Sequence, residues 1–344
     1  KSGNGSWNNS SSWNATPIYK QRRVIFVIIL YSFWNYNIYG HPQKIDAKMR
    51  KVLLFTTIIY SLSVFADYSM HVDSEEVINE LVNEHGFEKT FVINVLKNAK
   101  KRKEMLESVA NPAEKTKTWD DYKAIFLKKK RIRDGKIFIE DNLLTLQRAE
   151  KDFGVPKEVI TAILGVETDY GRVMGKYRVI DSLTTLGFDD PRRSEFFRSE
   201  LIQFFILTRE NNLDILKTKG SYAGAMGYGQ FISSSYRAYA IDYDGDEYVD
   251  LFNSVEDAIG SIANYLNKHG WKKEGSIVSK VKPNNVRKFY KPHKSLTRFL
   301  PLTFTEKGEE LHFIADDNFY AIARYNISDV YAMAVYYLAE EFKK

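Results

Sequence analysis

The chain has 344 residues, of which 44% are hydrophobic, 27% are charged and 14% are aromatic. This balance excludes a wholly disordered or collagen-like chain, and it supplies enough apolar side chains for one large core or two ordinary ones. Because cysteine is absent, the sequence excludes disulfide bonds, thiolate metal sites, a cysteine nucleophile and a lipid-modified cysteine.

The net charge of +6 comes from the beginning of the chain. Residues 1–66 hold eight of the 50 basic side chains and one of the 44 acidic ones, so the rest of the chain is close to neutral. A basic surface that binds nucleic acid is therefore not expected on the folded part, and we predict no nucleic-acid partner.

Two segments at the start of the chain have the composition of a leader. Residues 1–48 are predicted to be a disordered or upstream leader, because Asn, Ser and Gly dominate its beginning and Met49 is a candidate start. Residues 49–66 have the pattern of a secretory signal peptide: two basic residues, an apolar stretch and a small residue, Ala66, before the expected cleavage point. A buried core helix is the alternative interpretation. The signal peptide predicts a soluble periplasmic protein without a membrane anchor after cleavage.

Helical spacing of apolar residues runs through most of the remaining chain. The predicted helices cover residues 74–103, 141–153, 157–166, 194–209, 256–268 and 328–342. Short apolar runs broken by Pro and Gly, which are typical of strands, occur between residues 275 and 320. The predicted fold is mainly α (α+β), with an N-terminal helical region (67–155), a central core (156–274), a small β-rich insertion (275–320) and a C-terminal helix that completes the core (321–344).

Glu167 is the candidate catalytic acid. It ends the apolar run 159–166, where neighbouring side chains would remove water from its carboxyl group. Burial disfavours the charged form, so the pKa is expected to rise, and a protonated carboxyl can act as a general acid. The alternative is a helix-end residue paired with Arg172 or Lys176.

Two further segments have the residue types of a ligand groove. Residues 220–231 contain four glycines, which let the backbone approach a ligand, and end near Gln230, whose amide can bond sugar groups. A tight turn that packs helices is the alternative. Arg192 and Arg193 follow a proline and could bind carboxylates, or could balance Glu195 and Glu200 in solvent.

An acidic loop within residues 242–257 resembles the start of an EF-hand. Asp242, Asp244 and Asp246 stand at positions 1, 3 and 5, and Tyr248 at position 7 offers its carbonyl oxygen. The loop departs from the standard pattern because Glu247 replaces glycine at position 6. The sequence predicts a structural Ca²⁺ site, with a solvated acidic turn as the alternative.

Five ordered motifs together resemble one enzyme family. They are Gly-Val-Glu-Thr-Asp-Tyr-Gly at 165–171, the segment 220–231, Pro191-Arg192-Arg193, Ala263-Asn264-Tyr265, and Arg324-Tyr325-Asn326 with Tyr331. This set resembles the membrane-bound lytic murein transglycosylase B family of peptidoglycan lytic transglycosylases, over residues 75–340. The resemblance implies a lysozyme-like helical catalytic domain and peptidoglycan glycan strands as the substrate.

The resemblance also implies a role for individual residues. Glu167 would protonate the bond between N-acetylmuramic acid and N-acetylglucosamine, and would then take the proton of the muramyl C6 hydroxyl, giving a 1,6-anhydro product. No cofactor is expected for catalysis, and we expect a monomer. The implied glycan contacts are Arg192, Arg193, Ser221, Gln230, Tyr265, Tyr325, Asn326 and Tyr331. The implied metal ligands are Asp242, Asp244, Asp246, Tyr248 and Asp257, with Glu256 as the alternative closing acid.

Two other functions remain open at this stage. A hydrolytic muramidase would need a second carboxylate to activate water, and Asp169, Asp181 and Asp189 lie near Glu167 in the sequence. A noncatalytic peptidoglycan-binding scaffold is the other alternative, although the retained glutamate argues against it.

Overall fold

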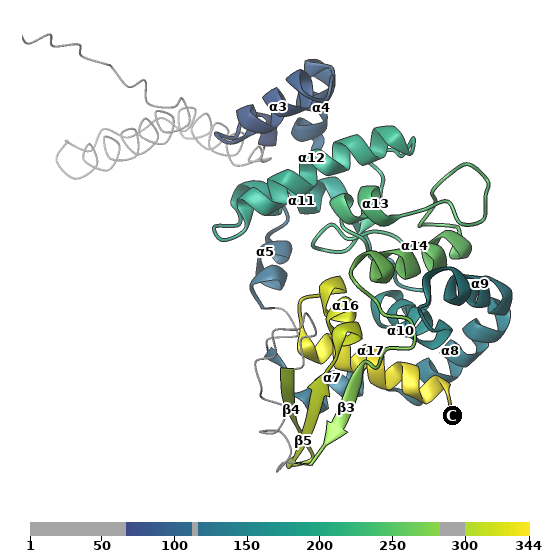
Figure 1. Ribbon diagram of the computed structural model, residues 1–344. Coiled ribbons are helices and arrows are strands. Elements are labelled where there is room, and N and C mark those ends of the chain that lie inside the picture. Colours follow the sequence, from purple (N-terminus) through teal and green to yellow (C-terminus); the bar gives the residue numbers. More distant parts are fainter. Residues whose placement is uncertain (1–66, 112–115, 283–299) are drawn as a thin grey trace, which may run out of the picture. The chain divides into compact units, whose positions relative to one another are not determined.

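The computed structural model describes residues 67–111, 116–282 and 300–344 (Figure 1). The predicted leader (1–48) and signal peptide (49–66) therefore lie outside the described residues. The described residues fall within one unit, Phe65–Lys344. They are mainly helical, as the sequence predicts, and they contain two small sheets.

The N-terminal region is built from short amphipathic helices. The elements are η1 (Tyr68–Met70), α3 (Ser74–Asn83), α4 (Lys89–Asn98) and α5 (Lys103–Ala110). In α3, Val77 and Leu81 are four residues apart and are both buried, so one stripe faces the interior. The helices predicted within 74–103 are separate, because the chain turns at Gly86, which has φ +67°.

The next four helices include the one that carries Glu167. They are α7 (Trp119–Phe126), α8 (Lys129–Asp141), α9 (Leu143–Phe153) and α10 (Lys157–Thr168). Gly154 ends α9 in a left-handed conformation, and Pro156 stands at the N-cap of α10. Figure 1 shows α10 surrounded by α8, α9, α14 and α17, with which it makes contact.

The middle of the chain adds four more helices. α11 (Val179–Asp189) packs on α12 (Ser194–Glu210), and α13 (Ser233–Tyr239) links α12 to α14 (Val255–Lys268). A two-residue pairing of β1 (Tyr177–Arg178) with β2 (Lys219–Gly220) joins the segment after Glu167 to the glycine-rich segment.

The predicted β-rich insertion is a three-stranded antiparallel sheet. Its strands β3 (Val278–Val281), β4 (Leu300–Glu306) and β5 (Glu309–Ala315) lie in the order β3-β5-β4. The sheet is attached to the helices by aromatic packing, with the rings of Trp119 and Phe304 5.2 Å apart.

The C-terminal segment differs from the single helix predicted for 321–344. It forms α16 (Asp317–Tyr325) and α17 (Asp329–Phe342), separated by residues 326–328, of which Asn326 is extended. The side chain of Ser328 accepts a hydrogen bond from the Tyr331 N–H and thereby caps the start of α17. This break places Tyr325, Asn326 and Tyr331 together at the junction.

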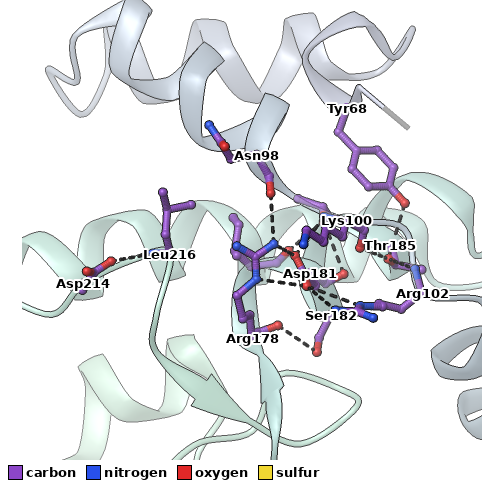
Figure 2. A network of polar contacts seen from close by, with 12 residues as sticks. Tyr68, Asn98, Lys100, Arg102, Arg178, Asp181, Ser182, Thr185, Asp214 and Leu216 are labelled. Atoms are coloured by element: carbon purple, nitrogen blue, oxygen red, sulfur yellow. Dashed lines mark hydrogen bonds and ion pairs between the residues drawn. The ribbon is translucent and has the colours of Figure 1, made fainter. Parts of the chain in front are cut away.

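A buried carboxylate joins the N-terminal region to α11 (Figure 2). Asp181 is fully buried and accepts hydrogen bonds from the Lys100 N–H at 2.8 Å and from Arg178 Nη2 at 2.5 Å. The Arg102 guanidinium lies 3.4 Å from the same carboxylate, and Arg178 also donates to the carbonyl of Asn98 at 3.0 Å. These polar groups have lost contact with water, and they form hydrogen bonds with one another instead.

Candidate active site

Helix α10 delivers Glu167 to the site from the interior. Residues from Val159 to Gly165 are buried on every face of the helix, whereas Glu167, in its last turn, is half-buried. Arg172, which was a possible ion-pair partner, binds Asp169 and Asp134. The carboxyl of Glu167 thus stands where an apolar helix meets the surface.

Tyr331 makes direct contact with Glu167. Its hydroxyl donates a hydrogen bond of 2.6 Å to Glu167 Oε1, although the two residues are 164 positions apart. Tyr331 is 1% exposed. Burial, and next the nearby charge of Glu167, raise the pKa of Tyr331 well above its usual value. The phenol therefore stays protonated and acts toward the carboxylate as a donor.

Tyr325 joins the C-terminal segment to the glycine-rich segment. Its hydroxyl donates to the Gly229 carbonyl at 2.6 Å. A Cβ at position 229 would lie only 2.8 Å from that hydroxyl oxygen, so glycine allows this contact. Burial and the charge of Glu167 raise the pKa of Tyr325 well above its usual value.

The loop that follows Glu167 lies against the glycine-rich segment at two glycines. A Cβ on Gly171 would come 1.9 Å from the Tyr228 ring, and a Cβ on Gly175 would come 2.1 Å from the Gly220 carbonyl. Both glycines also have positive φ, at +86° and +99°. Four segments therefore meet around Glu167: the end of α10, the loop 171–176, the segment 220–231 and the α16–α17 junction.

Gln230 and Ser221 hold these loops in shape. The Gln230 amide donates to the Gly227 carbonyl at 2.9 Å and to the Met174 carbonyl at 3.2 Å. The Ser221 hydroxyl accepts from the N–H groups of Ala223 and Ala225. Both side chains thus stabilise the conformation of these loops, and their predicted glycan contacts stay predictions.

Arg192 and Arg193 are exposed, at the turn before α12. The Arg193 guanidinium lies 4.4 Å from the centre of the Phe196 ring, a cation–π contact. Glu200, one possible partner from the sequence, is buried and accepts hydrogen bonds from Ser234 N and Oγ. The structure thus gives Glu200 a role in packing α12 against α13.

Tyr265 is 7% exposed and belongs to an aromatic cluster. Its ring stacks on His269 at 3.9 Å and lies 4.8 Å from the Tyr325 ring, while its hydroxyl donates to the Arg324 carbonyl at 2.8 Å. The ring and the hydroxyl of Tyr265 thus contact the segment that carries Tyr325. Asn326, which is half-buried, follows directly.

The three carboxylates that could have served as a second catalytic acid are all paired with cations. Asp181 is bound as described above. Asp189 accepts from the Tyr68 hydroxyl at 2.6 Å and from Lys101 Nζ at 2.5 Å. Asp169 lies between Arg131 and Arg172. Each of these side chains is therefore an ion-pair partner. Glu167, by contrast, accepts a hydrogen bond from the neutral phenol of Tyr331.

The acidic loop brings three predicted ligands together. Carboxylate oxygens of Asp242, Asp244 and Asp257 lie within 4.8 Å of one another. Asp257 is fully buried in the first turn of α14, and burial raises its pKa despite hydrogen bonds from backbone N–H groups of the loop. Asp246 and Tyr248 are exposed, and Asp246 accepts from the Tyr248 N–H. Three clustered acidic oxygens suit a hard divalent cation.

Arg131 was not predicted from the sequence. It comes from α8, 38 residues before Asp169, within a run of basic residues that resembles an ordinary solvated helix face. Only the fold places it against the segment that follows Glu167.

The model of the SLT transglycosylase domain matches residues 70–340, which is most of the chain. The protein belongs to the SLT transglycosylase family. It is 37% identical over 302 residues to membrane-bound lytic murein transglycosylase B of Escherichia coli K12, covering 80% of this chain and 83% of that protein.

Solved structures of other family members have the same lysozyme-like fold. Soluble lytic transglycosylase SltB1 of Pseudomonas aeruginosa is 39% identical with a TM-score of 0.72, covering 78% of this chain and 97% of SltB1. The E. coli lytic transglycosylase Slt35 in complex with calcium is 35% identical with a TM-score of 0.71, covering 79% and 93%. Within the three described stretches of this family member, no helix is both long and apolar enough to cross a membrane.

The contact at Gly175 yields a test of the site's architecture. Gly86→Ala should lower the free energy of unfolding by about 1 kcal/mol, because alanine disfavours the positive φ there. The added Cβ itself would lie in open space. Gly175→Ala should cost about 2–4 kcal/mol, because the new Cβ also overlaps the Gly220 backbone. Urea unfolding of both variants measures the difference, and equal costs would contradict the close approach of the two loops.

Proposed function

We propose that this protein is a lytic transglycosylase of the periplasm, acting as a monomer. It cleaves the β-1,4 bond between N-acetylmuramic acid and N-acetylglucosamine in peptidoglycan without adding water. The observation that carries the proposal is the placement of one half-buried carboxyl, Glu167, at the end of a buried helix and 2.6 Å from the Tyr331 hydroxyl. The names of the relatives, which are lytic transglycosylases, support the same reaction class.

The mechanism uses one carboxyl group twice. Protonated Glu167 donates its proton to the glycosidic oxygen, the bond from that oxygen to C1 of the muramyl residue breaks, and N-acetylglucosamine leaves with a free hydroxyl. The carboxylate so formed takes the proton of the muramyl C6 hydroxyl as its oxygen attacks C1. The product carries a 1,6-anhydro ring, and Glu167 is protonated again.

The surroundings of Glu167 favour this route over hydrolysis. Hydrolytic glycosidases normally use two carboxyl groups that flank the bond. Asp169, Asp181 and Asp189, the candidates near Glu167 in sequence, are each held by cationic side chains. The oxygens of these carboxylates are already engaged by guanidinium or ammonium donors, so they are less available to activate a water molecule.

The groove residues divide into binding and supporting roles in this proposal. Arg192 and Arg193 are exposed and bind carboxylates of the lactyl groups or stem peptides. Ser221, Gln230 and Asn326 offer polar groups to the glycan where the loops meet. Tyr325 and Tyr331 contact the reacting region through Gly229 and Glu167, and Tyr265 holds Tyr325 in place.

Glu167→Gln tests the reaction class. Purified protein incubated with peptidoglycan should release anhydromuropeptides, identified by mass spectrometry, and the variant should lower the rate at least about 100-fold because it has no proton to donate. Glu158→Gln is the matched control, since Glu158 lies in the first turn of the same helix and pairs with Lys157. Products heavier by one water would indicate a muramidase. Binding without products from the unmodified protein would indicate a scaffold.

Tyr331→Phe tests the contact between the hydroxyl and Glu167. Loss of a hydrogen bond to a charged group should lower kcat about 10- to 100-fold, while the anhydro product stays the same. Tyr336→Phe, in the same helix, should leave kcat within about 2-fold. Equal rates for the two variants would contradict a role for Tyr331 in orienting the carboxyl.

We also propose a structural Ca²⁺ ion in the acidic loop. Asp242, Asp244 and Asp257 would hold it, with the Asp246 carboxylate and the Tyr248 carbonyl as further ligands. The ion would supply positive charge that relieves repulsion between the clustered carboxylates. The Slt35 structure in complex with calcium supports this assignment.

Asp257→Asn should abolish the gain in stability that calcium confers. For the unmodified protein, calcium at 100 times its Kd should add about 2.7 kcal/mol to the free energy of unfolding. Glu256→Gln should keep this gain, because Glu256 is outside the cluster of three acids. Thermal unfolding and calorimetry measure both effects. An unmodified protein that binds no calcium at millimolar concentration would contradict the site.

A further inference from the structure

The chain leaves the catalytic helix through three consecutive residues in the left-handed conformation. They are Asp169 with φ +54°, Tyr170 with φ +62° and Gly171 with φ +86°. Glycine adopts this region freely, but it costs other residues about 1 kcal/mol or more each. The turn that begins two residues after Glu167 therefore needs contacts that compensate for this cost.

The carboxylate of Asp169 makes such contacts with both of its oxygens. Oδ1 accepts from Arg131 Nε at 3.1 Å, and Oδ2 accepts from Arg172 Nε at 2.9 Å and Nη2 at 2.8 Å. Partial burial alone would raise the pKa of Asp169, but the hydrogen bonds from Arg172 and Arg131 outweigh it and hold the pKa below its usual value. Asp169 is therefore a charged anchor at neutral pH.

Arg131, near the start of α8, is itself fixed by the end of α7. Its Nη1 donates to the Ile125 carbonyl at 2.9 Å, and its guanidinium lies over the Phe126 ring at 5.3 Å. Its own carbonyl accepts the Tyr170 hydroxyl at 2.7 Å. The left-handed turn is thus tied to α8 twice, through the side chain of Asp169 and through that of Tyr170.

Arg172 extends the same network to a second acid. Its Nη2 lies 2.8 Å from Asp134 Oδ2, and Asp134 also binds Lys130 and Arg133. The network bridges α8 to the residue that follows the left-handed turn. A pair of exposed charges would contribute little, whereas a network on two rigid elements holds a geometry.

We propose that Asp169 is a positioning residue: clamped between Arg131 and Arg172, it fixes the last turn of α10 and thereby the direction of the Glu167 side chain. This inference rests on the proposed function, in which Glu167 transfers the proton. It gives the segment that follows Glu167 a role in orienting the Glu167 carboxyl group. Asp169 itself touches no reacting atom.

The test compares Asp169→Asn with a matched variant elsewhere. Asparagine is favoured in the left-handed region, so this change removes the charge and keeps the backbone preference. The control is Glu210→Gln, which removes a similar two-point pair with Arg237, with both contacts at 2.7 Å, at the far end of α12 from Arg193. Both variants should lose comparable, small amounts of unfolding free energy.

Only Asp169→Asn should alter catalysis. We expect kcat on peptidoglycan to fall at least 10-fold with KM within 3-fold, an unchanged pH optimum and an unchanged product, while Glu210→Gln keeps kcat within 2-fold. Arg131→Lys keeps the charge but has a different donor geometry, so its kcat should lie between those of Asp169→Asn and Glu210→Gln. Equal kcat values for Asp169→Asn and Glu210→Gln, or a raised KM with unchanged kcat, would overturn the proposal.

Amide hydrogen exchange provides a readout that needs no turnover. Amides of residues 165–173 should exchange at least 10-fold faster in Asp169→Asn and at the unmodified rate in Glu210→Gln. Unchanged exchange in Asp169→Asn would overturn the proposal even if kcat fell. Absence of product from the unmodified protein would instead refute the proposed function, and the exchange data would still decide whether Asp169 holds the turn.

Discussion

Helix α10 is buried on all sides and ends in a half-buried carboxyl group, Glu167, and the rest of the candidate site depends on this arrangement. The apolar side chains of α10 fix its position from within, since it packs on α8, α9, α14 and α17. Its last turn then has to present Glu167 in one orientation. Tyr331 meets the carboxyl from the C-terminal segment, and the loop after α10 is held on the glycine-rich segment at Gly171 and Gly175.

The acidic side chains around this helix differ in the partners that the fold provides. Asp169, Asp181 and Asp189 form ion pairs with guanidinium or ammonium groups and thereby connect separate segments of the chain. Asp242, Asp244 and Asp257 face one another, an arrangement that favours a cation. Glu167 receives a hydrogen bond from a neutral phenol. The same functional group, a carboxylate, thus stands in three different environments, which are set by the side chains beside it.

Local patterns in the sequence predict the parts of this site but not their assembly. Helical periodicity predicts α10, and the apolar run before Glu167 predicts that this carboxyl group lies at the end of a buried helix. The pairs that complete the site, such as Glu167 with Tyr331 and Asp169 with Arg131, join residues 164 and 38 positions apart, and only packing sets such contacts. Tyr265 illustrates the limit. Its residue type suggests a sugar contact, which stays a prediction, and the sequence does not show that its ring lies beside those of His269 and Tyr325.

The α16–α17 junction also has a consequence for the order in which the enzyme is made. Synthesis runs from the N-terminus, so Glu167 leaves the ribosome long before Tyr325 and Tyr331. Until Tyr325 and Tyr331 are added, the Glu167 carboxyl lacks its hydroxyl donor and Gly229 lacks its bond to Tyr325. The contacts around Glu167 are therefore complete only after the residues of α16 and α17 have been synthesised and α17 has packed against α10.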